Sequence, residues 1–410
     1  VCTNCHDSHS NEVRFDDNRL CTQCHVSSVF DRPEHHRHEA GGAGAACVNC
    51  HMPARTFMVV DDRRDHGFRV PEPRLTLELG VPNACNQCHA DKDAQWALKA
   101  LDGWGVSQAI RAGHAPVLNE AWSGRIAGLP GLLALAGKPD KAAILRASAI
   151  SAAQNFPSQE VLAVTQQLLS SENPLLRAST VQSMDWVPVA QRYAMLRDLI
   201  GDDSKSVRMA VARQLSSFPA EQLPGESARE LQDLYREYLD SMKRNADMPE
   251  EQMNLGLFYG ANGDPAAAEK SYRTALKLSP AFVPALLNLA DLYRENGMDQ
   301  QAEPLLSRAI ELAPQDPSPH YAMGLLRIRQ GRLDESISFL QTAAGSQQQN
   351  ARYRYVYAVA LWEAGKREQA VAELESALEV QPGNRQLISA LASYYEQLGE
   401  EEKLQALIQQ

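Results

Sequence analysis

The motif Cys-x-x-Cys-His occurs four times in the first ninety residues of this 410-residue chain, and the four copies contain all eight cysteines. Two thiols followed directly by a histidine are typical of covalent haem attachment: the thiols form thioethers to the porphyrin vinyl groups and the histidine ligates the iron. The sequence therefore predicts four haem c groups in one short segment, which is typical of proteins that transfer electrons. The predicted attachment residues are Cys2, Cys5, Cys21, Cys24, Cys47, Cys50, Cys85 and Cys88, and the predicted proximal ligands are His6, His25, His51 and His89.

Zinc binding and disulfide bonding are two other uses of eight cysteines. The spacing between Cys5 and Cys21 also fits a zinc site built from two Cys-x-x-Cys pairs. Eight cysteines could instead form four disulfides in a secreted protein. Neither alternative requires a histidine directly after every cysteine pair, and histidine accounts for only 11 of the 410 residues. Haem attachment is therefore the favoured interpretation.

Nine of the eleven histidines lie among the four motifs, and five of these nine are not part of a motif. A second axial histidine on each iron would explain this clustering, because imidazole on both faces gives a six-coordinate, low-spin iron suited to electron transfer. His9 follows His6 too closely to reach the opposite face of the same iron, so we expect it to ligate a neighbouring haem. Met52 and Met58 remain alternative axial ligands. The predicted distal ligands are His9, His35, His38 and His66.

The net charge and the hydrophobic pattern exclude some classes of function. A net charge of −11 argues against nucleic acid as the main partner. No apolar run is long enough to span a bilayer. Haem attachment to this motif normally takes place outside the cytoplasm, so we expect a periplasmic or extracellular location. The chain begins one residue before the first motif and shows no signal peptide, which predicts a processed chain or a piece of a longer protein.

The first part of the chain, residues 1–118, is predicted to form an irregular tetrahaem domain. Up to the fourth motif it has little periodic apolar patterning and many Gly, Pro, Asn and Asp residues. Pro71, Pro73 and Pro82 predict extended chain between the third and fourth motifs. A helix predicted over residues 93–101 is expected to cover the fourth haem.

Two kinds of internal repeat follow. Residues 119–245 contain a similar segment every 31 residues, marked by an arginine, which resembles HEAT helix pairs; an ordinary helical domain is the alternative. Residues 246–410 contain glycines spaced by 34 residues and parallel columns of alanine, which is typical of tetratricopeptide repeats. The predicted fold class is mainly α, with an irregular tetrahaem cytochrome c segment followed by an α-solenoid. The arginines are Arg146, Arg177 and Arg208, and the glycines are Gly263, Gly297, Gly331, Gly365 and Gly399.

The haem segment and the helix after it resemble a family of multihaem c-type cytochromes with C-terminal tetratricopeptide repeats. The resemblance depends on Cys-Thr-Asn-Cys-His-Asp-Ser-His at 2–9, His-His-Arg-His at 35–38, Cys-Val-Asn-Cys-His-Met-Pro at 47–53, Arg-Arg-Asp-His-Gly-Phe-Arg-Val-Pro at 63–71 and Pro-Asn-Ala-Cys-Asn-Gln-Cys-His-Ala-Asp-Lys at 82–92. Members of this family usually carry further motifs upstream, in an arrangement similar to the nitrogen-cycle octahaem cytochromes. The resemblance therefore implies the C-terminal part of a longer octahaem-type cytochrome.

Electron transfer through four haems is the function that the sequence favours. Stacked helix pairs form a concave groove that binds a peptide or a partner protein, so the repeats are expected to dock a redox partner or to organise an assembly, including a homo-oligomer; a purely structural solenoid is the alternative. A nitrite- or hydroxylamine-type oxidoreductase would need one haem with an open distal position and nearby acid–base groups. A subunit of an extracellular cytochrome filament is a third interpretation. With enough histidines to fill both axial positions, an electron carrier is favoured over a catalyst.

Overall fold

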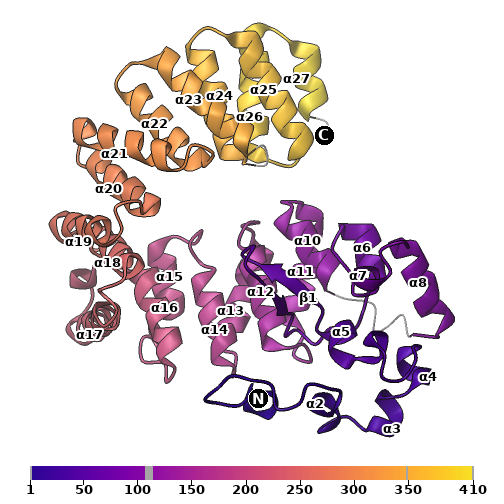
Figure 1. Ribbon diagram of the computed structural model, residues 1–410. Coiled ribbons are helices and arrows are strands. Elements are labelled where there is room, and N and C mark those ends of the chain that lie inside the picture. Colours follow the sequence, from indigo (N-terminus) through magenta and orange to yellow (C-terminus); the bar gives the residue numbers. More distant parts are fainter. Residues whose placement is uncertain (1, 107–113, 348–349, 409–410) are drawn as a thin grey trace. The chain divides into compact units, whose positions relative to one another are not determined.

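The computed structural model describes residues 2–106, 114–347 and 350–408, and the chain divides into two compact units, Val1–Asn119 and Glu120–Gln410 (Figure 1). The helix α10 (Ala115–Trp122) runs across the division between them. Within the described residues, no helix is both long and apolar enough to cross a membrane. The two units are built in different ways and are described in turn.

The first unit consists of short helices joined by irregular chain. Its strands β1 (Ala54–Phe57) and β2 (Asp61–Arg64) form an antiparallel hairpin, in which Ala54 lies opposite Arg64. The helix α8 begins after Asp93, whose side chain accepts a hydrogen bond from the backbone N–H of Trp96 and so caps the first turn. The other helices are α1 (Cys2–Cys5), α2 (Arg19–Thr22), α3 (Ser27–Phe30), α4 (Pro33–His36), η1 (Ala43–Ala45), α5 (Cys47–His51), α6 (Pro73–Leu79), α7 (Cys85–Cys88) and α8 (Ala94–Gly103).

Few apolar side chains are buried in the first unit. A unit of this size normally buries a continuous apolar core. Here large apolar side chains lie exposed instead, including Val59, which is 95% exposed at the tip of the β1–β2 hairpin. The polypeptide of this unit therefore supplies little of the core that would hold it together. Among the described residues up to 119, the buried apolar side chains are Ala45, Met52, Pro53, Pro73, Ala97, Leu101 and Leu118.

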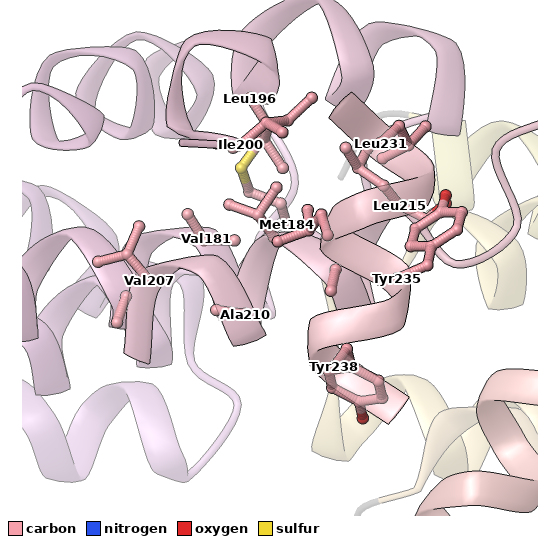
Figure 2. Close-up of a cluster of buried hydrophobic side chains, with 14 of the residues drawn as sticks. Val181, Met184, Leu196, Ile200, Val207, Ala210, Leu215, Leu231, Tyr235 and Tyr238 are labelled. Atoms are coloured by element: carbon pink, nitrogen blue, oxygen red, sulfur yellow. The ribbon is translucent and has the colours of Figure 1, made fainter. Parts of the chain in front are cut away.

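The second unit begins with paired helices that pack in sequence order. One cluster of buried side chains joins the helices between residues 159 and 243 and includes Met184, Leu196, Leu215 and Leu231 (Figure 2). Because each helix pair buries its apolar face against the next pair, the core is continuous along the stack. The helices are α11 (Leu129–Gly137), α12 (Ala143–Ala153), α13 (Gln159–Leu169), α14 (Pro174–Gln182), α15 (Val189–Leu196), α16 (Lys205–Leu215) and α17 (Gly225–Lys243).

The later helices of the second unit follow the 34-residue period. Each period contains two helices, and the repeated glycine lies directly after the first of them. Gly263 and Gly297 have φ angles of 81° and 72°, in the left-handed region that glycine adopts without steric strain. These helices are α18 (Pro249–Ala261), α19 (Pro265–Leu278), α20 (Val283–Glu295), α21 (Asp299–Leu312), α22 (Pro317–Arg329), α23 (Leu333–Ser346), α24 (Ala351–Glu363), α25 (Arg367–Val380), α26 (Arg385–Leu398) and α27 (Glu401–Ile408).

Small residues allow the two helices of a pair to approach closely, as the sequence predicted. Ala268 and Ala302 are buried at the helix contacts. A Cβ atom added at Gly324 in α22 would lie 2.7 Å from the side chain of Leu340 in α23, which is closer than real carbon atoms approach. The helix pairs and their small contact residues confirm the predicted α-solenoid.

Candidate cofactor-binding site

Each of the four cysteine motifs folds into about one turn of helix. The N–H of the motif histidine donates to the carbonyl of the first cysteine, at 2.9 Å for His6, 3.0 Å for His25 and 2.9 Å for His89, and His51 lies inside α5. Residues at positions i, i+3 and i+4 share one face of a helix. This local structure therefore places both thiols and the imidazole of a motif on one side, as the attachment of one planar group requires.

Three motif histidines lie opposite histidines from elsewhere in the first unit. A ligating imidazole nitrogen is about 2 Å from its metal, and its ring centre is about 1 Å further, so two axial imidazoles have centres about 6 Å apart. Two stacked aromatic rings without a metal between them can have the same separation. The hydrogen bonds of the rings are therefore needed to show whether each imidazole has a nitrogen available to a metal. The ring-centre distances are 6.2 Å for His6 and His66, 6.2 Å for His51 and His35, and 6.1 Å for His89 and His38.

Four of these six histidines use Nδ1 to bind a backbone carbonyl. A carbonyl oxygen only accepts, so Nδ1 carries the proton and Nε2 keeps its lone pair. The bonds are His6 to Asn11 at 3.0 Å, His51 to Arg69 at 2.8 Å, His66 to Arg64 at 2.9 Å, and His38 to His36. This is the tautomer of a histidine that ligates a metal through Nε2 and is oriented by a second partner.

The run of three histidines at 35–38 separates into two paired rings and one unpaired ring. The backbone N–H of His38 donates to Nδ1 of His36 at 3.2 Å, which places the His36 proton on Nε2 and makes that nitrogen unsuited to ligation. The His38 ring lies so close to Gly44 that a Cβ atom there would be 2.2 Å from it. Burial and the neighbouring His51 lower the pKa of His35, which favours the neutral ring. His35 and His38 are also the two members of the run that the sequence analysis selected.

His9 and His25 lie outside these pairs. The ring of His25 contacts Phe30 edge-on at 5.5 Å, and Phe30 contacts His35 in the same way at 5.4 Å. His9 is exposed, and its backbone N–H donates to Asp7 at 2.9 Å. Within the described residues, no histidine ring lies against either of them. The assignment of His9 as a distal ligand therefore stays a prediction.

The eight cysteines are all free. Cys2, Cys24 and Cys88 are exposed and the other five are partly buried. Burial raises the pKa of the Cys47 thiol to about 11, with the nearby Cys21 as a further cause. In the part of the chain that the structure describes, no group of three or more His, Cys, Asp or Glu side chains is arranged to hold a metal ion. The histidine pairs offer two protein ligands each.

Several contacts near the pairs were not evident from the sequence. Trp96 of α8 packs on the ring of His89 with centres 4.8 Å apart, so the helix expected to cover the fourth haem does contact that motif. Arg64 of β2 donates to the carbonyls of Val48 and Met52 at 3.3 and 3.2 Å, and so ties the hairpin to α5. These contacts join segments whose proximity no local pattern signals; an aromatic residue near a motif is the only sequence clue to Trp96.

Comparisons with known proteins concern the repeats. The HEAT-repeat family model matches residues 129–216, and the tetratricopeptide-repeat family model matches residues 261–326, 300–360 and 327–394. A comparison with curated proteins gives no match. The two family matches cover the segments in which the sequence shows the 31- and 34-residue periods.

A comparison with solved structures finds chains that resemble part of this one. The crystal structure of MamA protein shares 21% identity, over 39% of this chain and 88% of that chain, with a TM-score of 0.35. YrrB, described as a TPR protein with an unusual peptide-binding site, shares 16% identity over 42% of this chain and 88% of that chain, with a TM-score of 0.34. A chain in the crystal structure of the APC/C hetero-tetramer Cut9–Hcn1 shares 16% identity, over 66% of this chain and 53% of that chain, with a TM-score of 0.37. From its family matches, the chain contains HEAT repeats followed by tetratricopeptide repeats.

Proposed function

We propose that this protein transfers electrons through four haem c groups bound by the Cys-x-x-Cys-His motifs, and that its repeats dock it to a redox partner. One observation carries the proposal. Three motif histidines each face a histidine from another segment at about 6 Å, and most of these rings present a free Nε2.

The residues present fit haem better than they fit a metal ion alone. Each pair supplies two imidazoles, which suits a metal that brings its own equatorial ligands. The two thiols on the same helix face as each motif histidine suit the edge of the same macrocycle. Exposed apolar side chains such as Phe30, Val59 and Trp96 would be covered by an apolar group of this size. When bound, haem c supplies an iron that changes between ferric and ferrous states and so carries one electron.

The paired histidines are suited to electron transfer and not to binding a substrate. If haem is bound, the two histidines of each pair would hold its iron, and the iron would supply one-electron chemistry without a free position for a substrate. In four of the six rings a hydrogen bond from Nδ1 to a backbone carbonyl fixes the ring and raises the basicity of Nε2. His6 and His66 both have such bonds and so form the most completely supported pair.

The repeats support a role in protein–protein interaction or assembly, because tetratricopeptide repeats build a concave surface for that purpose. We propose redox proteins as the partners, with a homo-oligomer or a filament as the assembled form. Since haem attachment to Cys-x-x-Cys-His normally takes place outside the cytoplasm, we propose a periplasmic or extracellular location.

The surroundings of His25 favour one second candidate function. Its ring faces Phe30 where the other motif histidines face a histidine. An open position opposite His25 would admit a small ligand, and the protein would then be an oxidoreductase of the nitrite or hydroxylamine type. Ligation by His9 would close that position and favour the electron carrier.

Low-temperature electron paramagnetic resonance of the ferric holoprotein tests this proposal. We expect low-spin signals from the paired sites, and a new high-spin signal in His66→Ala because the position opposite His6 is then open. His36→Ala is the matched control and should leave the spectrum unchanged, since its Nε2 carries the proton. A His66→Ala spectrum identical to that of the unmodified protein would contradict the pairing. A high-spin signal in the unmodified protein that shifts with nitrite would instead support the enzyme.

A further inference from the structure

In the second and third copies of the 31-residue repeat, the repeated arginine binds a carboxylate. Arg177 donates from Nε and Nη2 to the two carboxylate oxygens of Asp202, both at 2.8 Å, and Arg208 does the same to Glu237 at 2.8 and 2.7 Å. Nη1 of each arginine also donates to a backbone carbonyl in its own loop, that of Ser171 at 2.7 Å and that of Asp202 at 2.6 Å. Such bidentate pairs are among the strong polar contacts of proteins.

The first arginine of this column, Arg146, lacks an equivalent carboxylate. Asp202 follows Arg177 by 25 residues, and the residue 25 positions after Arg146 is Ser171. Nε of Arg146 donates to the carbonyl of Ala136 at 2.9 Å, and Arg146 forms no ion pair with any described residue. Nε of Arg146 is therefore engaged, unlike Nε of Arg177, and Nη1 and Nη2 are the nitrogens that remain available to a carboxylate.

A pocket of about 400 Å³ is lined by both Arg146 and Ser171, the residue equivalent to Asp202. It is bounded by the turn between α11 and α12 on one side and by the turn between α13 and α14 on the other. Lys141 adds a second positive charge; its ammonium lies 3.7 Å from Asp140 and its side chain is about half exposed. The lining residues include Pro139, Lys141, Arg146, Ser171, Glu172 and Asn173.

We propose that this pocket binds a carboxylate group, which pairs with Nη1 and Nη2 of Arg146 as Asp202 pairs with Nε and Nη2 of Arg177 in the next repeat. The column itself favours a carboxylate over other anions, because both filled positions hold one. Glu172 lines the pocket and repels an anion. Its equivalent one period later, Asp203, lies near the intact pair of Arg177 and Asp202, so an acidic neighbour does not prevent such pairing. The inference concerns the HEAT repeats and does not depend on haem.

Calorimetric titration of the full-length holoprotein with three probes tests the proposal. The probes are succinate, an acetylated tetraglutamate peptide and inorganic phosphate. We expect both carboxylate probes to bind, and Arg146→Gln to weaken them about tenfold or more. Lys138→Gln is the matched control, because Lys138 is exposed on the same turn but does not line the pocket. If the peptide binds more strongly than succinate, the natural ligand is a carboxylate of a protein. If the two bind equally, it is a small acid.

A second variant tests the proposal even if Arg146→Gln disturbs the fold. Ser171→Asp places a carboxylate at the position equivalent to Asp202, so it should abolish binding of both probes and raise the melting temperature. Glu172→Gln should strengthen binding, because it removes a repulsive charge. Binding that is the same in Arg146→Gln and Ser171→Asp as in the unmodified protein would overturn the proposal. So would binding of phosphate alone, or failure of both carboxylate probes to bind.

Discussion

The two units of this chain are stabilised by different kinds of contact. The second unit buries continuous clusters of leucine, alanine and tyrosine along its stacked helices. The first unit buries few apolar side chains and joins its segments through polar groups. Asn18, for example, donates to the carbonyl of Ala45 at 2.9 Å and accepts from the N–H of Cys47 at 2.9 Å. The comparison shows that periodic apolar residues specify the solenoid, whereas cysteine and histidine chemistry must specify most of the first unit.

The short helices of the first unit sharpen this difference. Helices of four or five residues, such as α1 and α5, are too short to be stable on their own in water. A segment of this size without a core usually needs a metal, a disulfide or a bound group. We therefore expect the first unit to depend on the haems that we propose and the second unit to fold without them.

The largest expected effect comes from preventing haem attachment altogether. Replacing all eight cysteines by alanine should unfold the first unit, because its polypeptide supplies so little core. The second unit should keep its structure, since its clusters contain no cysteine. Hydrogen exchange measured by mass spectrometry should show lost protection over residues 2–106 and unchanged protection over 129–346. Equal protection of the first unit with and without haem would contradict the expectation that this unit needs haem to fold.

A core substitution in the solenoid should destabilise the second unit and leave the first unit unchanged. Leu340 is fully buried between α22 and α23, and Leu340→Ala should cost about 2–5 kcal/mol of unfolding free energy. Urea unfolding followed by circular dichroism measures this loss, and the absorbance of the proposed haems should not change. Leu278→Ala is the control: Leu278 is 46% exposed, so its loss should cost about 0.5 kcal/mol. Similar costs at both positions would show that the assigned core is wrong.

An ion pair in the solenoid should make its stability depend on acid. Hydrogen bonds from Arg327 at 2.7 Å and Gln330 at 3.1 Å lower the pKa of Glu303 from 4.5 to about 2. A carboxyl whose pKa is lower in the folded state stabilises the fold above its unfolded pKa, and this contribution is lost as the pH falls from about 4.5 to about 2. About a third of the side chain is exposed, so after solvent screening we expect about 1–2 kcal/mol.

Stability curves at several pH values for Glu303→Gln measure that contribution. The variant should be less stable than the unmodified protein at pH 7, and the difference should disappear below pH 2. Glu311→Gln, at an exposed position of the same helix, should match the unmodified protein throughout. A difference that persists unchanged in acid would mean that the Glu303 charge is not its source.

The smallest expected effect concerns a helix cap. Asp264 precedes α19 and accepts a hydrogen bond from the N–H of Ala267 at 3.0 Å. Asp264→Ala should cost about 1 kcal/mol, and Asp264→Asn should cost little because asparagine caps equally well. Thermal unfolding of the two variants separates loss of the cap from loss of the charge. If both variants lose the same stability, the effect comes from the charge and not from the cap.

The solenoid was predictable from the sequence because its local requirements recur. Gly263 and Gly297 mark the helix ends, since the backbone there needs a positive φ. The arginine period also has a physical cause: Arg177 and Arg208 each bind a carbonyl of their own loop and a carboxylate of the next helical segment. The spacing shows that Arg146 has serine where Arg177 has aspartate, but the meaning of that difference depends on the ion pairs that the structure shows for Arg177 and Arg208.

The first unit was predictable in its chemistry but only partly in its geometry. The motifs identify the cysteines and proximal histidines, but spacing alone does not reveal that His35 meets His51 or that His66 meets His6. Prolines predicted extended chain between the third and fourth motifs, yet α6 begins there at Pro73, because proline fits the first turn of a helix. Contacts between distant segments decide such features, and no local pattern encodes them.

A haem count on the purified protein tests the central claim most directly. Intact-mass spectrometry combined with the alkaline pyridine absorbance assay should give four covalently attached haems per chain, one for each Cys-x-x-Cys-His motif. A chain that carries zinc or disulfides and no haem, although expressed with the haem-attachment machinery, would contradict the account.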